Sequence, residues 1–235
     1  MADLSQKTKD ALNGAATSTL TGILNRLGYG NMFLQNVHPL RLGMPRMVGL
    51  AYTLRFLPAR KGKSSPLGSA QQTAMEQCPP GHVLMIDSRG DPRAASAGDL
   101  FIGRLAARGC SGIVTDGGLR DSDGILKTGL PAYHQRPSSP PSPIVHMPYD
   151  IGLPIACGGV AVFPGDVIVG DVDGVVVIPA ELADDIAAEA AAQTQWDEWA
   201  EAEVAKGRSL IGLFPAQNDQ AKADYEAWKK ARGLS

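Results

Sequence analysis

His82-Val-Leu-Met-Ile-Asp87 and Gly112-Ile-Val-Thr-Asp116 are two short apolar runs, and each ends in an aspartate. The intervening residues 98–108 carry apolar side chains at helical spacing. This succession of strand, helix and strand predicts a βαβ unit with parallel strands. The segments that follow the carboxyl ends of those strands should therefore lie together at one edge of the sheet, where α/β proteins bind their ligands.

The rest of the chain shows the same periodicities and predicts one α/β domain with helices at both ends. Residues 4–28 form a helical region, with Ser18 as its candidate cap. Further strands are expected at residues 48–57, 160–163, 166–170 and 175–178, and further helices at residues 71–77, 180–206 and 217–231. The last strands are joined by short turns such as Asp173-Gly174, and no internal repeat is visible.

The charge balance excludes several classes of partner. The 235 residues include 22 Lys and Arg against 24 Asp and Glu, and no apolar run is long enough to span a membrane. We therefore expect neither a nucleic-acid partner nor a membrane partner. The polar amino terminus lacks the apolar stretch of a secretion signal, which indicates a cytoplasmic protein. Cys78, Cys110 and Cys157 are odd in number and far apart in sequence, as is typical of buried thiols in a reducing compartment.

The segments after the two strands of the βαβ unit hold the densest group of candidate functional residues. Gly98 and Asp99 stand at the start of the expected helix, where unpaired backbone N–H groups and the helix dipole favour an anion. After the second strand, Gly117-Gly118 allow the backbone to turn tightly and to approach a ligand closely. Both features indicate a binding site for a small anionic molecule.

Arg120 and Asp121 follow this turn. The planar guanidinium of Arg120 suits a carboxylate or an enolate oxygen, and Asp121 suits a hard divalent cation that keeps several waters. Asp99 and Asp116 are candidates for holding those waters. The alternative interpretation is a surface turn with an ion pair between the two neighbouring side chains.

A resemblance to a known family adds to this interpretation. Gly98-Asp99-Leu100, the run from Gly109 to Asp121, Pro164-Gly-Asp166 and the run from Gly170 to Pro179 resemble the RraA-like family over roughly residues 15–205. The resemblance implies a single α/β/α sandwich with a β-barrel-like core of the swivelling β/β/α type. It places an RraA-like aldolase domain at residues 1–209 and a helical C-terminal extension at residues 210–235. It also implies a homotrimer or a homohexamer with the active site between subunits.

The resemblance assigns roles to individual residues. Arg120 matches the family's catalytic and substrate-binding arginine, and Asp121 matches its metal-binding aspartate. The segment that binds the substrate carboxylate, largely through backbone N–H groups, corresponds to Gly98, Asp99, Leu100 and Phe101. Asp99 also matches an acidic residue that hydrogen-bonds a water of the metal. The cofactor implied is a divalent cation, Mg²⁺ or Mn²⁺.

A further acidic residue is expected from the C-terminal helix of a neighbouring subunit. Asp197, Glu198 and Glu201 lie in the corresponding region, and we select Glu198 as the catalytic residue among them. Acidic side chains on a long helix are also typical of a solvated surface.

The activity implied is that of a lyase acting on small 2-oxo acids through a pyruvate enolate. The type reactions are cleavage of 4-hydroxy-4-methyl-2-oxoglutarate and decarboxylation of oxaloacetate. Two alternatives stay open, namely a dehydratase or lyase for a sugar-derived 2-oxo-3-deoxy acid and a non-catalytic regulator of ribonuclease E. The methyltransferase label often given to the family has no support here, because no GxGxxG loop opens a nucleotide-binding unit. A Schiff-base route would need Lys127, the lysine nearest to the motif.

Three segments depart from the shorter family members. These are residues 58–67, the Pro/Ser-rich residues 137–143 and the last residues, 210–235. We expect the first two to lie in surface loops, and all three could reshape the pocket.

Overall fold

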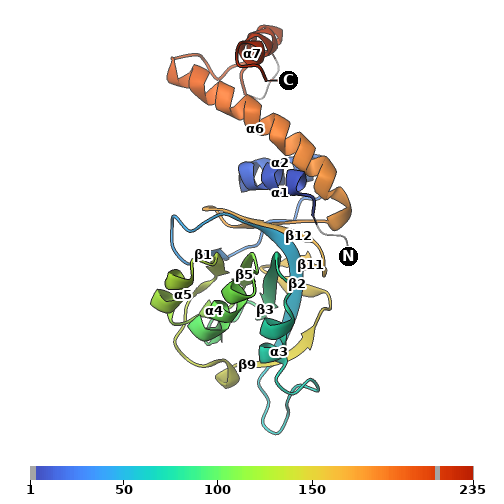
Figure 1. Ribbon diagram of the computed structural model, residues 1–235, viewed down its shortest axis with the longest axis vertical. Coiled ribbons are helices and arrows are strands. Elements are labelled where there is room, and N and C mark those ends of the chain that lie inside the picture. Colours follow the sequence, from blue (N-terminus) through green and yellow to red (C-terminus); the bar gives the residue numbers. More distant parts are fainter. Residues whose placement is uncertain (1–3, 215–217, 235) are drawn as a thin grey trace.

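The structure of the protein is a computed structural model that describes residues 4–214 and 218–234. Its centre is a mixed sheet that curls into a nearly closed barrel (Figure 1). The strands run in the order β1 (His38–Pro39), β7 (Ala132–His134), β5 (Gly112–Thr115), β3 (His82–Asp87), β2 (Met47–Pro58), β12 (Val167–Gly170) and β13 (Val175–Ile178). β9 (His146–Ile151) pairs with the outer part of the long strand β2. The predicted α/β class with a barrel-like core and C-terminal helices is confirmed.

The central strands form the predicted βαβ arrangement. β2, β3, β5 and β7 are parallel neighbours, and α4 (Asp99–Ala107) connects β3 to β5 through the segment that holds the candidate site. β3 and β5 consist almost entirely of buried residues, as is usual for parallel strands covered on both faces.

Three apolar clusters account for the layers. One face of β3 and β5 packs against α3 (Ala70–Gln77), α4 and α5 (Ser122–Thr128). The opposite face fills the inside of the curled sheet, where Met85 and Val114 meet Ile168 and Val177. The outer side of β12 and β13 is covered by α1 (Gln6–Gly14), α2 (Thr17–Arg26) and α6 (Ala183–Ala205).

The helical region predicted at residues 4–28 is two helices, and the predicted cap is wrong. Ser18 lies inside α2 rather than at its start. The first N–H of α2 is capped from a distant turn, because Asp171 accepts hydrogen bonds from Thr17 N at 2.8 Å and from Thr17 Oγ1 at 2.9 Å. A cap supplied by tertiary structure leaves no local sequence signal. Ser5 caps α1, because its hydroxyl accepts a hydrogen bond from Thr8 N at 3.0 Å.

A second, smaller sheet was not predicted. β4 (Ala95–Ala97), β6 (Gly118–Leu119) and β8 (Arg136–Pro137) are parallel, with β6 in the middle. Strands of two or three residues are too short to show a periodic pattern. A separate hairpin pairs β10 (Ile155–Cys157) with β11 (Val160–Val162).

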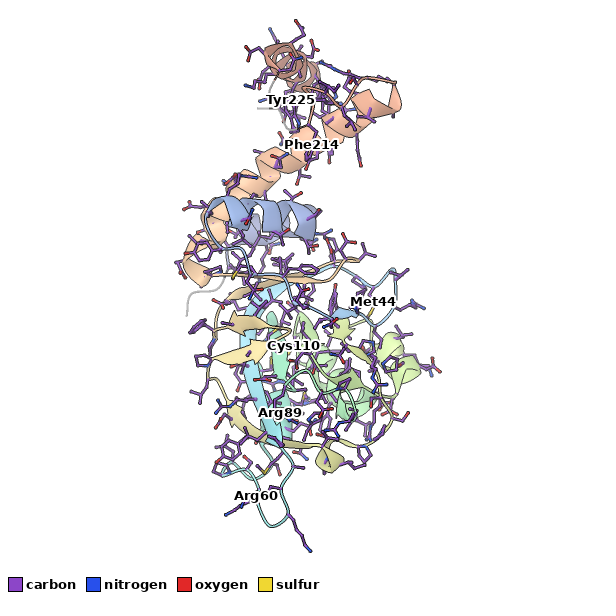
Figure 2. All side chains as sticks on the ribbon, turned by 180° about the vertical axis from the view of Figure 1, so that it is seen from behind. Met44, Arg60, Arg89, Cys110, Phe214 and Tyr225 are labelled. Atoms are coloured by element: carbon purple, nitrogen blue, oxygen red, sulfur yellow. The ribbon has the colours of Figure 1, made fainter. Side chains whose placement is uncertain are left out.

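The carboxyl-terminal part projects from the barrel as an arm. The 3-10 turn η2 (Ala180–Leu182) leads into α6, which crosses α1 and α2 and then continues away from the sheet to α7 (Asp219–Ala231) (Figure 1). The outer half of α6 and α7 share an aromatic cluster of Trp196, Trp199 and Tyr225. Figure 2 shows Tyr225 in this arm and Arg60 on a loop at the opposite end of the molecule.

The predicted helix at residues 217–231 is confirmed from Asp219 onward, whereas residue 217 lies outside the described residues. The domain boundary at residues 209 and 210 stays a prediction. All three cysteines are free and buried, as expected. None of the helices described is both long and apolar enough to cross a membrane.

The central sheet should make stability dependent on pH through His134 on β7. Burial, aided by the neighbouring His38, lowers the pKa of His134 to about 4, below its usual value near 6.5. The fold therefore favours the neutral ring, and the free energy of unfolding should fall as the pH drops from about 6.5 to about 4. We predict a shallower fall in the His134→Gln variant, measured by urea denaturation across this range. Identical pH dependence in the two proteins would contradict this prediction.

Candidate active site

The small sheet determines where the candidate site residues lie. Gly98 follows β4, and Arg120 follows the neighbouring strand β6. Ala97 and Leu119 are in register, and Arg120 N donates a hydrogen bond to Ala97 O at 3.1 Å. The carboxyl ends of two adjacent parallel strands thus deliver both segments to one edge, as the βαβ argument predicts, although the strands that deliver them belong to the small sheet.

Gly98 lies directly against the side chains of Arg120 and Asp121. A Cβ atom at this position would stand 2.6 Å from Asp121 Oδ2 and 3.1 Å from Arg120 Nε. The backbone of Gly98 is extended, with φ of −131°, a conformation open to any residue. Glycine is therefore required here by the space that Arg120 and Asp121 occupy and not by backbone freedom.

Asp121 adopts a left-handed backbone conformation, with φ of 59° and ψ of 43°. Asp is among the non-glycine residues that tolerate this region. The conformation turns the side chain back toward its neighbour, so that Arg120 Nε lies 3.3 Å from Asp121 Oδ2. Adjacent side chains would point to opposite sides of an extended strand, but here they lie on the same side. The two side chains are 42% and 46% exposed, so a ligand can reach them.

The alternative interpretation, a surface turn with an internal ion pair, also accounts for the contact between Arg120 and Asp121. It does not require the close approach of Gly98 from a second strand. This third partner distinguishes the site from an ordinary exposed turn.

Asp99 is held between two helix starts. It is the first residue of α4, and its carboxylate packs on Gly124 in the first turn of α5. A Cβ at Gly124 would stand 2.6 Å from Asp99 Cβ and 2.9 Å from Asp99 Cγ. Since α5 begins directly after Asp121, this contact brings Asp99 into the same neighbourhood as the pair at positions 120 and 121.

The remaining members of the expected substrate-binding segment differ in environment. Phe101 packs its ring against the core under α4, whereas the side chain of Leu100 is 86% exposed. The backbone N–H of Leu100 donates to Asp99 Oδ1 at 2.8 Å. A substrate carboxylate would have to replace Asp99 at this N–H group.

A cluster of buried hydroxyl groups lies beneath the candidate site, at the ends of the strands that lead to it. Ser88, Ser96 and Thr115 are inaccessible to solvent, and their hydroxyl oxygens lie 2.7–3.0 Å from one another. Thr115 Oγ1 also accepts a hydrogen bond from Gly117 N at 3.0 Å. The cluster joins the ends of β3 and β5 to β4. It was missed in the sequence, because three scattered hydroxyl residues form no local pattern.

Asp116 does not face the exposed site. It is 4% exposed, and its carboxylate accepts hydrogen bonds from Ser88 N at 2.6 Å and Gly90 N at 2.9 Å. Burial raises the pKa of this carboxyl above its usual value, against the hydrogen bonds that lower it. Asp116 therefore holds the loop after β3, and the expectation that it binds waters of a metal is wrong.

Glu198 lies apart from these residues within a single chain. It is exposed on the outer half of α6, in the arm that leads away from α4 and α5 (Figure 1). Its neighbour Asp197 accepts a hydrogen bond from Gln193 Nε2 at 2.8 Å, and Glu201 is exposed. A role for any of the three at the site requires a second copy of the chain.

The donor set of the site fits a hard cation that keeps most of its waters. Across residues 4–214 and 218–234, no three His, Cys, Asp or Glu side chains come together as a metal cage. Structural zinc usually takes four such ligands, whereas Mg²⁺ is commonly held by one or two carboxylates. The exposed carboxylate of Asp121, next to the space kept open by Gly98, matches the second case.

The segments at residues 58–67 and 137–143 have different surroundings. A cavity of about 500 Å³ is lined by residues of the first segment, including Arg60, and by Pro143 at the end of the second, but by neither Arg120 nor Asp121. The second segment runs beside the small sheet, where Ser138 N donates to Leu119 O at 2.8 Å and Ala95 N donates to Pro140 O at 2.9 Å.

Comparison with known proteins assigns the family. A sequence profile described as RraA-like, Aldolase/RraA, matches residues 8–177. The chain belongs to the RraA-like family. The carboxyl-terminal arm lies outside the matched residues.

Individual relatives agree with this assignment. A Halalkalibacterium halodurans protein named "Putative 4-hydroxy-4-methyl-2-oxoglutarate aldolase" is 41% identical over 106 residues, which cover 45% of this chain and half of that protein. The crystal structure of Streptomyces coelicolor RraAS2, described as an unusual member of the RNase ES inhibitor RraA protein family, is 29% identical with a TM-score of 0.78 and covers 86% of this chain and 98% of that one. An uncharacterized Pseudomonas syringae protein shares the fold, with a TM-score of 0.78 at 23% identity over 91% of this chain and 99% of that one.

The fit of Gly98 against its neighbours can be tested by Gly98→Ala. The added methyl group should push Arg120 and Asp121 aside and break their 3.3 Å contact. The free energy of unfolding should change by less than about 1 kcal/mol, because both neighbours are exposed side chains that can move. Crystal structures and urea denaturation provide the measurements.

The matched control is Gly103→Ala within α4. The nearest atom to a Cβ there is Thr128 Cγ2 at 4.0 Å, so the contact between Arg120 and Asp121 should persist. Alanine is favoured over glycine in a helix by about 1 kcal/mol, so this variant should be the more stable one. If Arg120 and Asp121 kept their positions in Gly98→Ala, the close approach of Gly98 would not determine their arrangement.

Proposed function

We propose that the protein is a divalent-metal-dependent lyase that cleaves small 2-oxo acids through the enolate of pyruvate. The type reactions are those of a 4-hydroxy-4-methyl-2-oxoglutarate aldolase and an oxaloacetate decarboxylase. The observation that carries the proposal is the three-way contact of Gly98, Arg120 and Asp121. In this contact the guanidinium of Arg120 can donate hydrogen bonds to a 2-oxo acid, and the carboxylate of Asp121 can serve as a ligand for a hard cation. The aldolase names of the relatives support the same reaction class.

In this proposal Asp121 holds Mg²⁺ or Mn²⁺ together with water molecules. When bound, the cation supplies Lewis acidity at the 2-oxo group, an effect of several kcal/mol in metal-assisted reactions. Arg120 donates hydrogen bonds to the oxygen that becomes negative, and one such donor contributes about 3 kcal/mol in other enzymes. The first N–H groups of α4, the helix that starts at Asp99, bind the substrate carboxylate.

The bond changes are simplest for 4-hydroxy-4-methyl-2-oxoglutarate. The hydroxyl on C4 loses its proton and becomes a carbonyl, while the electrons of the broken C3–C4 bond stay on the other fragment as pyruvate enolate. Addition of a proton to C3 then gives a second pyruvate. With oxaloacetate the leaving fragment is CO₂, and the same enolate results. We assign the proton transfers, through water, to Asp99 and to Glu198 from a neighbouring subunit.

The proposal includes an assembly. Because Glu198 lies on the arm that leads away from α4 and α5, it can act only at the site of another copy. A homotrimer or homohexamer with active sites between subunits meets this requirement.

The activity test measures release of pyruvate from 4-hydroxy-4-methyl-2-oxoglutarate and from oxaloacetate. We expect turnover that depends on added Mg²⁺ or Mn²⁺ and stops with EDTA. Arg120→Ala and Asp121→Ala should each lower kcat/KM by roughly 100-fold or more while leaving the fold intact. Asp123→Asn, an exposed acid on the first turn of α5, is the control and should retain wild-type rates.

Several outcomes would contradict the proposal. Turnover that EDTA leaves untouched would exclude the metal mechanism, and trapping of a covalent adduct at Lys127 by borohydride would establish a Schiff base instead. If pyruvate were released only from a sugar-derived 2-oxo-3-deoxy acid, the same site would act on the alternative substrate class. Inhibition of ribonuclease E by a chain that releases no pyruvate would identify a regulator instead. The family of the Streptomyces coelicolor relative is described as an RNase ES inhibitor family.

A further inference from the structure

Two of the three cysteines lie next to each other in the fold, although they stand 32 positions apart in the chain. Cys78 follows the last residue of α3, and Cys110 lies between α4 and β5. The Sγ atom of Cys110 is 3.7 Å from the carbonyl oxygen of Cys78 and 3.7 Å from that of Pro79. Both thiols belong to the apolar cluster under α3 and α4, whereas Cys157 belongs to the cluster inside the curled sheet. The structure thus pairs two thiols that are far apart in sequence.

Hydrogen bonds hold the two segments that carry these cysteines side by side. Arg108 Nε donates to Cys78 O at 3.3 Å, and Gly81 N donates to Gly109 O at 2.8 Å. A disulfide requires two Cα atoms that stay within about 7 Å of each other. Backbone segments joined on both sides of the pair keep Cys110 within reach of Cys78, which is the arrangement that a disulfide needs.

A cavity gives small molecules access to one of the two thiols. Its volume is about 480 Å³, and Cys110 belongs to its wall together with Lys9, Asp10 and Arg46. Cys110 is 7% exposed, whereas Cys78 is fully buried. Figure 2 shows Cys110 in the barrel part of the molecule, away from the arm. A reagent that enters the cavity therefore meets Cys110 before Cys78.

The two thiols also differ in how readily they ionise. A hydrogen bond between them lowers the pKa of Cys110 below its ordinary value, and the nearby Arg108 guanidinium acts in the same direction, against burial. The same hydrogen bond, together with burial, raises the pKa of Cys78. Because the thiolate is the nucleophile in thiol–disulfide exchange, Cys110 is suited to attack first and Cys78 to react second.

We propose that Cys110 and Cys78 form a redox-active dithiol, which a low-molecular-weight disulfide such as oxidised glutathione converts reversibly to a protein disulfide. The thiolate of Cys110 attacks one sulfur of oxidised glutathione, which forms a mixed disulfide and expels one glutathione thiolate. Cys78 then loses its proton and attacks the Cys110 sulfur, which releases the second glutathione. The two protein thiols lose two electrons and two protons in total, and oxidised glutathione becomes two molecules of glutathione.

The dithiol is separate from the candidate active site. Asp99 begins α4, and Cys110 follows the other end of this helix of nine residues. At a rise of about 1.5 Å per residue, the two ends of the helix are roughly 13 Å apart. The dithiol needs neither the metal nor the substrate of the proposed function, and its test uses neither.

The test treats the folded protein with oxidised glutathione and then blocks the remaining thiols with N-ethylmaleimide in urea. Mass spectrometry of the intact chain and of its peptides, without reduction, gives the readout. We expect a single chain that carries one maleimide, at Cys157, and in which the peptides of Cys78 and Cys110 are linked. Treatment with dithiothreitol should remove the link, so that all three cysteines then react with N-ethylmaleimide.

Single substitutions assign the order of attack. Cys78→Ala should stop at the mixed disulfide of Cys110 with glutathione, because the second thiol is missing. Cys110→Ala should leave Cys78 unmodified, since Cys78 is fully buried. The control Cys157→Ala should form the same link as the wild-type protein. Urea denaturation checks that each variant is folded, and the wild-type result stands without any variant.

Other products would overturn the inference. These are a wild-type protein that keeps three free thiols, a lasting glutathione adduct on Cys110 without the link, and a link that involves Cys157. If glutathione modified Cys78 in folded Cys110→Ala as fast as it modifies Cys110 in Cys78→Ala, Cys110 would not be the thiol that reacts first.

Discussion

The close approach of a glycine backbone to a guanidinium and a carboxylate is the contact on which the site depends. Gly98 comes from the end of β4, and Arg120 and Asp121 come from the end of β6. A side chain at position 98 would occupy the space that these two groups share. The left-handed conformation of Asp121 completes the arrangement, because it turns two sequence neighbours to the same side of the chain.

Both the curled sheet and the small sheet position this contact. The parallel strands β3 and β5 are buried on both faces and form a rigid base. The hydroxyl groups of Ser88, Ser96 and Thr115 connect that base to β4, and Asp116 holds the loop after β3. All four polar groups are buried and hydrogen-bonded, so they contribute to the position of the edge rather than to its chemistry.

The sequence predicts those parts of the fold that rest on local patterns. The apolar runs at residues 82–87 and 112–116 identify the parallel centre, and the Ala-rich and Glu-rich stretch at residues 180–206 identifies the long helix. The two-residue and three-residue strands of the small sheet escape prediction because they are held by tertiary contacts alone. The same reason explains Asp171, which replaces the expected Ser18 as the cap of α2.

The sequence predicts members of the candidate site but not its geometry. The resemblance supplied Gly98 to Phe101, Arg120 and Asp121, and the structure adds that Gly98 and Gly124 matter through the side chains packed on them. Gly124 carries no signal in the sequence, since it gains meaning only from the Asp99 side chain packed on it. Glu198 shows the converse case, because the role proposed for it would need a second copy of the chain.

The most direct test is a crystal structure of the protein with Mn²⁺ and oxalate, a stable analogue of pyruvate enolate. The account predicts an anomalous peak for manganese at the carboxylate of Asp121, with oxalate within hydrogen-bond distance of the Arg120 guanidinium. Manganese density elsewhere in the molecule, with the side chains at positions 120 and 121 turned apart, would contradict it.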